Sequence, residues 1–350
     1  MIEIAIYFLK LGCIGFGGPL ALIALMQKEL IQERKWMSED EFRRTFSLIK
    51  AMPGPVAFQM AVFLGYQKRK FWGGLIAGLC LILPAFLLMI LLGHFYQNFV
   101  EIPWLQKMMN GMQLGAFALI IWAFKSLVQG FQKKIFFWVL FISGVALSVS
   151  TSIPEPLLIL LFALIAVAAD KVPAGRKLNS LDPLILTLAS VCLKAGAFVF
   201  GTGLAIVPFL EADFVTRLGW ISHQQFMDAL AFGQLTPGPV TITVTFIGYK
   251  IAGLMGALVA TVSVFLPAFF HMVTWFPRMV AWLHRQTWIG AFSLGATAAV
   301  CSAIAIALLH LGKGWGAPQY AMIAVLLLLL HFWKFPAWGL ILLGGLLGFV

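Results

Sequence analysis

Two Pro-Gly-Pro turns constrain the fold of this chain more than any other feature of its sequence. The segment Met52-Pro53-Gly54-Pro55-Val56 recurs in the second half as Thr236-Pro237-Gly238-Pro239-Val240. Each copy lies in an apolar run, where proline removes an amide donor and blocks the carbonyl of the preceding turn. The helix must therefore stop and restart. The restarted helix presents free backbone N–H groups and the positive end of its dipole, which together favour an anion.

The composition places these breaks in a membrane. Hydrophobic residues make up 61% of the chain, charged residues only 11%, and the mean hydropathy is +0.97. The apolar runs do not alternate, so we expect an all-α polytopic membrane protein rather than a barrel. In lipid, a broken helix is tolerated only where it lines a cavity, so the paired breaks predict a substrate site near mid-membrane.

The basic residues lie in short clusters between apolar segments, which is typical of cytoplasmic loops and not of a nucleic-acid interface. We therefore expect a multi-pass protein of the plasma membrane, the inner membrane of a bacterium, in contact with lipid and without a nucleic-acid partner. Association into a homodimer is left open.

The apolar runs predict the order of the spans. Residues 4–26 read as one spanning helix, broken at the glycines around Gly17. Residues 45–67 are divided by Pro-Gly-Pro and flanked by basic clusters on both sides, which favours a re-entrant hairpin. Further spans are predicted at 73–95, 104–128, 133–150 and 156–170, followed by a basic linker at 171–177.

An internal repeat divides the chain into residues 1–178 and 179–350. At a shift of 184 residues Lys10 meets Lys194, Trp36 meets Trp220, and the two Pro-Gly-Pro turns coincide. The shift then becomes 183, and Pro84-Ala85-Phe86 meets Pro267-Ala268-Phe269.

The two halves differ in the charge of corresponding loops. Residues 27–44 carry five basic residues, whereas their counterpart 211–228 carries only Arg217. Because basic loops favour the cytoplasmic side, corresponding loops face opposite sides. We therefore predict two homologous inverted-topology repeats, with about ten transmembrane helices and two re-entrant Pro-Gly-Pro helical hairpins.

The chain resembles the two-domain chromate ion transporter family over nearly its whole length. The resemblance rests on Phe16-Gly17-Gly18-Pro19 paired with Phe200-Gly201-Thr202-Gly203, each followed by a loop tryptophan and then Pro-Gly-Pro. It implies a carrier that expels chromate, as an antiporter or otherwise coupled to protons or membrane potential, with sulfate as a second candidate. The chain departs from the family pattern at Thr202, where a further glycine is usual, and its two halves differ where Lys50 corresponds to Gln234.

Chromate and sulfate are tetrahedral dianions, so a carrier must replace their hydration shell with donors and positive charge. Lys10 and Lys194 lie in apolar segments at equivalent places, where an ionised lysine costs roughly 2.5–3.5 kcal/mol at a helix centre. Either they supply charge to the anion or they snorkel toward a helix end. The expected substrate-binding residues are Lys10, Gly17, Gly18, Pro53, Gly54, Pro55, Gln59, Lys194, Gly201, Thr202, Gln234, Thr236, Pro237, Gly238, Pro239 and Thr241.

The backbone amides that follow Gly17, Pro55, Gly201 and Pro239 are the remaining expected donors. The polar side chains near the turns have an alternative role, because they are also able to cap the half-helices.

Two acidic residues are candidates for proton coupling. Glu29 aligns with Asp213 just beyond the first helix break of each half. The alternative is that both are solvated loop charges paired with lysine or arginine.

Two other functions were weighed. A flippase for a phosphorylated lipid would also use re-entrant helices and basic residues, but it needs a lateral opening to lipid. An intramembrane enzyme is disfavoured, because the chain has no HExxH, no GxSxG and no clustered acidic residues within its spans. We therefore predict no catalytic residues, no metal and no cofactor.

Overall fold

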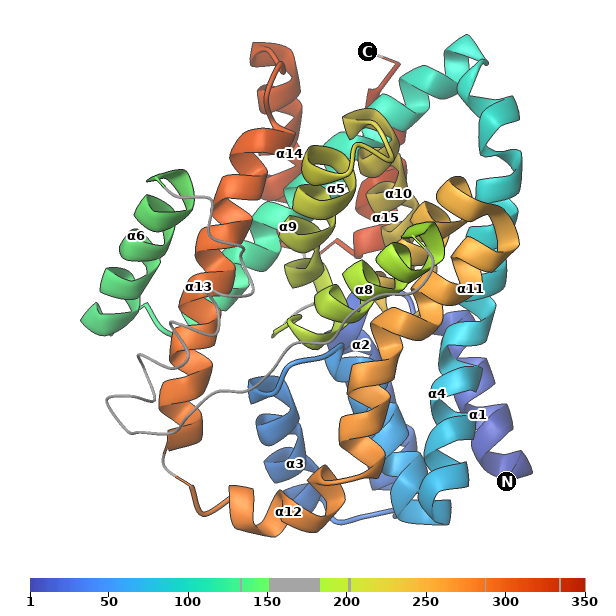
Figure 1. Cartoon of the computed structure of the whole chain (residues 1–350), viewed down its shortest axis with the longest axis vertical. Helices are drawn as coiled ribbons and strands as arrows, with labels where there is room; N and C mark the ends of the chain where they lie inside the picture. Colours follow the sequence, from blue (N-terminus) through green and yellow to red (C-terminus); the bar gives the residue numbers. More distant parts are fainter. Residues whose placement is uncertain (133, 151–182, 201–202, 287, 334, 350) are drawn as a thin grey trace.

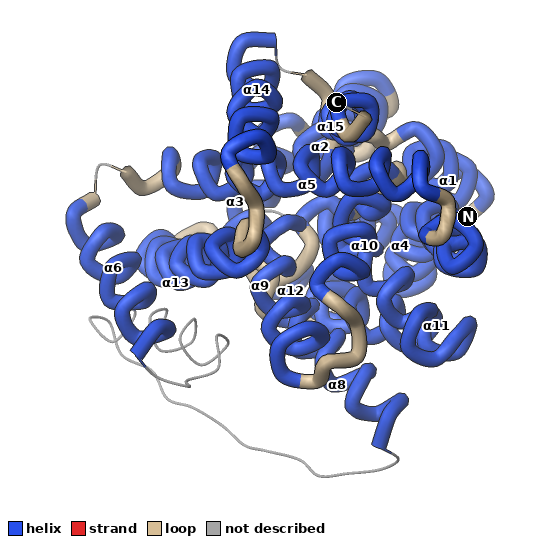
Figure 2. The backbone as a smooth tube through the Cα atoms, turned by 90° about the horizontal axis from the view of Figure 1, so that it is seen from above, coloured by secondary structure: helices blue, strands red, loops and turns tan. Residues whose placement is uncertain are grey.

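The computed structural model describes residues 1–132, 134–150, 183–200, 203–286, 288–333 and 335–349, and regular structure within these ranges is helical (Figures 1 and 2). The predicted span at 156–170, the linker at 171–177 and the boundary after residue 178 lie outside them. Among the described residues, four helices are long and apolar enough to cross a membrane: Val56–Tyr96, Pro103–Gln129, Val240–Val273 and Trp288–Leu311. Four shorter apolar helices accompany them, so the all-α polytopic class is confirmed and the count of about ten stays a prediction.

The chain begins with a helical hairpin. Helix α1 (Ile2–Ile14) is followed by α2 (Gly18–Met26) and the π-helix η1 (Gln27–Glu33). Between them the chain reverses, because Gly17 and Gly18 take φ values of +105° and +78°, which residues with a side chain rarely adopt. Arg34 Nη1 accordingly lies 3.2 Å from Glu3 Oε1 at the open end of the hairpin. The prediction of one broken spanning helix at 4–26 was therefore wrong.

The first Pro-Gly-Pro turn forms the tip of a second hairpin. Helix α3 (Glu39–Ala51) is capped by Ser38, whose hydroxyl accepts the N–H of Glu41, and α4 (Val56–Val100) begins after the turn. Lys68 Nζ lies 4.8 Å from the centroid of the Trp36 ring, so the two ends of this segment meet. The expected division of 45–67 by Pro-Gly-Pro is confirmed.

Helix α4 contains a further reversal at Arg69 and Lys70. Arg69 has φ −143° and ψ 31°, and Lys70 has φ 51° and ψ −142°. Residues 71–100 beyond this break include the predicted span 73–95. Helices α5 (Pro103–Gln129) and α6 (Ile135–Ser150) then match the predicted spans 104–128 and 133–150.

The second half repeats this order of elements. Its break inside α11 lies at Ala252 (φ −145°, ψ 33°) and Gly253 (φ 58°, ψ −148°), the same geometry as at Arg69 and Lys70. The duplication in sequence is thus also a duplication of backbone conformation. The elements are α8 (Pro183–Ala197), η2 (Gly203–Ile206), α9 (Val207–Leu210), η3 (Glu211–Arg217), α10 (His223–Leu235), η4 (Val240–Ile242), α11 (Thr243–Val273), α12 (Phe276–Leu283), α13 (Trp288–Leu311), α14 (Ala317–Trp333) and α15 (Ala337–Leu347).

The two kinked helices lie side by side and antiparallel. The rings of Phe71 and Phe269 are 5.7 Å apart, and His94 Nδ1 lies 3.0 Å from Tyr249 Oη. The break in α4 therefore lies beside the end of α11, and the break in α11 beside the end of α4. In Figure 1, α3 and α12 lie at the lower end of the molecule, and α10 and the C-terminus at the upper end. Helices α6 and α13 pack together on the opposite side from α4 and α11 (Figure 2).

Candidate functional site

The helix breaks of the two halves meet at the centre of the molecule. The backbone N–H of Gly54 donates to the carbonyl oxygen of Val199 at 2.6 Å. The N–H of Gly238 donates to the carbonyl oxygen of Gly15 at 3.0 Å. Gly54 corresponds to Gly238 and Gly15 to Val199 at the 184-residue shift, so the two bonds are equivalent. Each Pro-Gly-Pro turn is held by the first helix break of the other half.

Each turn also packs on α4 or α11 of the opposite half. A Cβ atom at Gly54 would lie 3.0 Å from Cβ of Ala268, and one at Gly238 would lie 3.7 Å from Cβ of Ala85. Ala85 and Ala268 are the middle residues of the repeated Pro-Ala-Phe segments. Each Pro-Ala-Phe segment therefore packs against the Pro-Gly-Pro turn of the other half.

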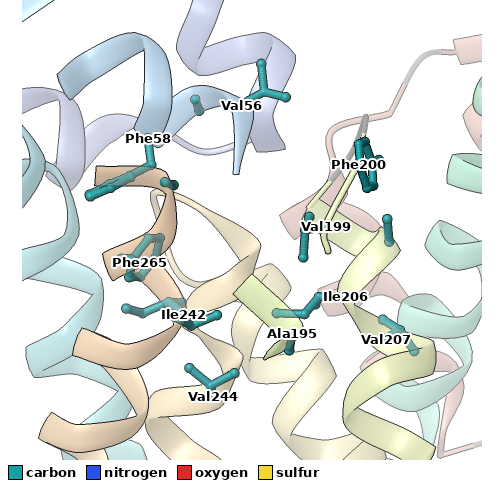
Figure 3. Packing of buried hydrophobic residues seen from close by; sticks show 14 of the residues in the cluster. Val56, Phe58, Ala195, Val199, Phe200, Ile206, Val207, Ile242, Val244 and Phe265 are labelled. Atoms are coloured by element: carbon teal, nitrogen blue, oxygen red, sulfur yellow. The ribbon is translucent and has the colours of Figure 1, made fainter. Parts of the chain in front are cut away.

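Apolar side chains fill the space around these breaks (Figure 3). Val56, Val199, Ile206 and Ile242 are buried there, and the rings of Phe58 and Phe265 have centroids 4.6 Å apart. The two Pro-Gly-Pro turns, the break after α1 and the residues just after α8 are thus adjacent, and the centre is packed in this conformation. A dianion would reach the breaks only after these side chains move apart.

The polar side chains beside the turns fall into two groups. Gln59 Nε2 donates to the carbonyl of Pro53 at 2.7 Å, and the Thr236 hydroxyl donates to the carbonyl of Gly233 at 3.1 Å, so both bond to backbone near their own turn. Gln234 Nε2 and Thr241 Oγ1 are buried and have no hydrogen-bond partner among the described residues. Gln234 and Thr241 are therefore the free donors near the second turn.

Backbone donors are also present at the restarted helices. The first-turn amides of α4, at Val56, Ala57 and Phe58, have no carbonyl within the helix to bond to. In the second half the N–H of Ile242 already bonds to Pro239, which leaves Val240 and Thr241 at the equivalent place. The amides of Gly54 and Gly238 are engaged across the repeat and are not available to a ligand.

Lys10 and Lys194 are each paired with the predicted acidic residue of their own half. Lys10 Nζ lies 3.9 Å from Glu29 Oε2, and Lys194 Nζ contacts Asp213 Oδ2. The two pairs coincide at the 184-residue shift. Lysine and carboxylate therefore neutralise each other where the sequence suggested a free positive charge.

The two ion pairs differ in exposure. Asp213 has 4% of its side chain exposed and Lys194 30%, whereas Glu29 has 26% and Lys10 59%. A buried ion pair is stable only with close geometry and further hydrogen bonds, which Asp213 obtains from Arg217 Nε at 2.8 Å. The equivalent residues thus form a close, largely buried ion pair in the second half and a longer, more exposed ion pair, called open below, in the first half.

The remaining predicted residues lie in the turns themselves. Gly17 caps the N-terminus of α2 and Gly18 is its first residue, while the prolines of both Pro-Gly-Pro turns flank glycines with positive φ. Gly201 and Thr202 lie outside the described residues. The structure therefore brings the two Pro-Gly-Pro turns, the first break of the first half and the end of α8 to one place, with the lysine–carboxylate pairs on the same half-helices.

Sequence reasoning missed two contributors to this region. Arg34 Nη2 contacts Glu29 Oε1 at 2.5 Å, and Arg217 takes the same role for Asp213, although the two arginines are offset by one residue in the repeat. That offset hid their correspondence. Asp228, in α10, accepts hydrogen bonds from Tyr96 and Gln113, partners that no spacing in the sequence indicates.

Comparison with known proteins finds similar sequences over nearly the whole chain. The sequence model of the family described as chromate transporter matches residues 2–168 and 186–349. The chain is 36% identical to the chromate transport protein of Cupriavidus metallidurans over 331 residues, which covers 89% of this chain and 82% of the relative. It is also 36% identical to a probable chromate transport protein of Synechococcus elongatus, covering 88% and 83% of the two chains.

A third relative, the chromate transport protein of Pseudomonas aeruginosa, is 31% identical over 334 residues, with 87% of this chain and 80% of the relative covered. No solved structure matches the chain. These relatives carry the names of transport proteins and not of enzymes.

Proposed function

The chain belongs to the chromate transporter family, and we propose that it is a secondary active transporter that expels chromate, with sulfate as a second candidate cargo. The proposal adds direction and mechanism to the membership. A tetrahedral dianion would bind between the two halves, at the N-terminal ends of the restarted helices.

The observation that carries this proposal is the meeting of the helix breaks. The reciprocal bonds from Gly54 to Val199 and from Gly238 to Gly15 hold the Pro-Gly-Pro turns of both halves together. The first-turn amides of α4 and η4, together with the free donors of Gln234 and Thr241, then lie around one region. Breaks in two long helices reduce stability unless the backbone groups they release find partners, and an oxyanion supplies acceptors on every side.

We place the coupling in the two lysine–carboxylate pairs. While Asp213 is ionised it neutralises Lys194, and Glu29 does the same for Lys10. Protonation of the carboxylate would release the lysine to attract the dianion, so one proton and the dianion would cross together with a net charge of −1, and the inside-negative membrane potential would drive them outward. Arg217 and Arg34 stabilise the ionised carboxylates and so oppose this release.

The two halves, residues 1–178 and 179–350, would act as inverted repeats around the shared site. The antiparallel packing of α4 and α11 supports this arrangement, as do the equivalent backbone breaks at opposite ends of the pair. The hairpins of α3 with the start of α4, and of α10 with η4 and the start of α11, would be the re-entrant elements.

Counterflow of labelled chromate in proteoliposomes tests the function. Vesicles loaded with unlabelled chromate should accumulate the label transiently, and unlabelled sulfate should compete if it shares the site. An imposed pH gradient and then an imposed voltage separate the two forms of coupling. Vesicles that show no chromate or sulfate counterflow, while the purified protein retains a polyprenyl phosphate, would support the lipid flippase instead.

A further inference from the structure

A buried carboxylate joins three helices at the upper end of the molecule in Figure 1. Asp228 lies in α10 and only 1% of it is exposed. Tyr96 Oη, near the end of α4, donates to Asp228 Oδ2 at 2.6 Å, and Gln113 Nε2, in α5, donates to Oδ1 at 2.8 Å. Lys250 Nζ, from α11, lies 5.0 Å from the centroid of the Tyr96 ring. These contacts seal α10 against its neighbours.

The equivalent residue of the first half lies in an open place. At the 184-residue shift Asp228 corresponds to Arg44, which occupies the same position in α3 and is exposed. Arg44 lines a cleft of about 570 Å³ between α3 and α12. In Figure 1 these two helices lie at the opposite end of the molecule from α10.

The cleft is lined by charges of both signs, with one arginine on each wall. Arg44 faces His284 and Arg285 across it, and Asp40 and Glu41 lie at the start of α3. Burial lowers the pKa of His284, and the charge of Arg44 lowers it further, so the imidazole is neutral near pH 7. The inner wall of the cleft includes the buried Thr45, which lies about two helical turns before the first Pro-Gly-Pro turn.

The lysine–carboxylate pairs show a similar difference in exposure between the two halves. The Lys10–Glu29 pair of the first half is open, and the Lys194–Asp213 pair of the second half is closed. The first half is thus open and the second half closed at two separate places.

We propose that the contact of Asp228 with Tyr96 and Gln113 is the closed gate of an alternating-access carrier, and that the Arg44 cleft is the open mouth through which the oxyanion approaches. This inference rests on the proposed transport function. Exchange of conformation between the two halves would open the Asp228 contact and close the cleft between α3 and α12 around Arg44. Arg44 attracts the dianion into the mouth, and Asp228 excludes anions from the closed end.

Cysteine labelling from water tests the gate without any substrate. The exposed Cys13 and half-buried Cys80 are first replaced by alanine, since Cys192 and Cys301 are buried. Ala281→Cys reports on the cleft, and Ala229→Cys, a buried neighbour of Asp228, reports on the closed end. In detergent-solubilised protein, where a hydrophilic maleimide reaches both ends, the reagent should label Ala281→Cys and leave Ala229→Cys unlabelled while the gate is intact.

Opening the gate should reverse this pattern. Adding Gln113→Leu or Asp228→Ala should raise labelling of Ala229→Cys at least tenfold and lower labelling of Ala281→Cys. Thr261→Val is the matched control. It removes a buried hydroxyl contact with Thr245 inside α11, and Thr261 lies neither in the Asp228 contact nor in the Arg44 cleft. Tyr96→Phe, which removes one donor only, should give a smaller change in the same direction, and it serves if the larger substitutions unfold the protein.

The proposal is overturned if the gate variants leave labelling of both reporters unchanged, or if both reporters become labelled to the same extent. Because labelling requires no cargo, these outcomes are separate from those of the counterflow assay. Reciprocal labelling without chromate counterflow would reject the proposed cargo and keep the gate.

Discussion

Gly54 donates its backbone N–H to the carbonyl of Val199 at 2.6 Å, and so joins the Pro-Gly-Pro turn of the first half to the end of α8 in the second. The equivalent bond joins Gly238 to Gly15. Because each half supplies one donor and one acceptor, neither turn is completed by its own repeat. The site is therefore assembled only when both halves are folded against each other.

Substitution of Gly54 should destabilise the protein more than substitution of Gly238. Both have positive φ, +126° and +100°, so alanine at either costs about 1–3 kcal/mol of backbone strain. At Gly54 the added methyl would also lie 2.5 Å from Gln59 Nε2, whereas at Gly238 the nearest atom is at 3.7 Å. In detergent, the Tm of Gly54→Ala should be lower than that of Gly238→Ala, and the control Gly290→Ala, in a helix with room for a methyl group, should not lower Tm. Equal Tm values for Gly54→Ala and Gly290→Ala would contradict the packing described.

Replacement of Lys70 by glycine should stabilise the protein. Lys70 has φ 51° and ψ −142°, a conformation that Gly253 adopts without strain at the equivalent place. Relief of about 1–3 kcal/mol of strain should exceed the roughly 0.5–1 kcal/mol entropic cost of glycine. The control Lys68→Gly, two residues earlier and still helical, also loses the contact with the Trp36 ring and should lose at least about 1 kcal/mol. A lower Tm for Lys70→Gly than for Lys68→Gly would refute the argument.

The two equivalent carboxylates should differ in their contribution to stability. Asp213→Asn leaves Lys194 without its buried counter-charge and should lower the free energy of unfolding by about 3–5 kcal/mol. Glu29→Gln disrupts an open pair and should cost no more than about 1 kcal/mol. Denaturation of both variants in the same detergent measures the difference. Adding Lys194→Gln should restore part of the loss in Asp213→Asn, and an equal loss in the two single variants would count against the asymmetry.

Removal of either lysine should weaken anion binding. A hydrogen bond to a charged group contributes about 1.5–3 kcal/mol, so Lys10→Ala and Lys194→Ala should each raise the chromate concentration for half-maximal counterflow roughly 10–100-fold. Lys313→Ala, an exposed lysine beyond the end of α13, is the control for general loss of positive charge. Full transport by correctly inserted Lys10→Ala and Lys194→Ala proteins would remove the lysines from the site.

Cross-linking α10 to α5 should stop transport in the present conformation. Gln224 Nε2 and Asn110 Oδ1 lie 3.4 Å apart across these helices, at the same end as Asp228. A short bifunctional thiol reagent on the pair Gln224→Cys and Asn110→Cys should abolish counterflow, and reduction should restore it. Either cysteine alone, treated in the same way, should transport normally. Unimpaired counterflow by the cross-linked pair would show that α10 and α5 do not separate during the cycle.

The repeat in the sequence predicted which residues are equivalent, but not which residues touch. It aligned Lys10 with Lys194 and Glu29 with Asp213, and both equivalences hold in the structure as ion pairs. It did not indicate that each lysine is neutralised within its own half, because contact depends on how the hairpin closes.

Two reversals of the chain were harder to foresee. Residues 4–26 have the length and apolar character of one span, and only the positive φ of Gly17 and Gly18 turns them into a hairpin. At Arg69-Lys70 the sequence looks like a basic loop, and the clearest signal of a helix reversal was Gly253 in the other repeat. No sequence pattern indicates the contacts of Asp228, because Tyr96 and Gln113 belong to helices far from it along the chain.

The two halves carry different residues at one equivalent position, Arg44 in the first half and Asp228 in the second. This difference bears on the free energies of the two orientations of the proposed carrier. A carrier built from identical halves would spend equal time facing each way. Here one orientation is stabilised by two hydrogen bonds to the Asp228 carboxylate. In the other orientation the equivalent contact would be made by Arg44. In the proposed cycle the empty protein therefore has a preferred resting orientation, and each 1.4 kcal/mol of that preference would make the apparent affinities measured from inside and outside differ tenfold. A concentration ratio of the anion across the membrane still requires an external driving gradient. The orientation preference would set the anion concentrations at which transport from each side is half-maximal, and it would leave the final concentration ratio unchanged.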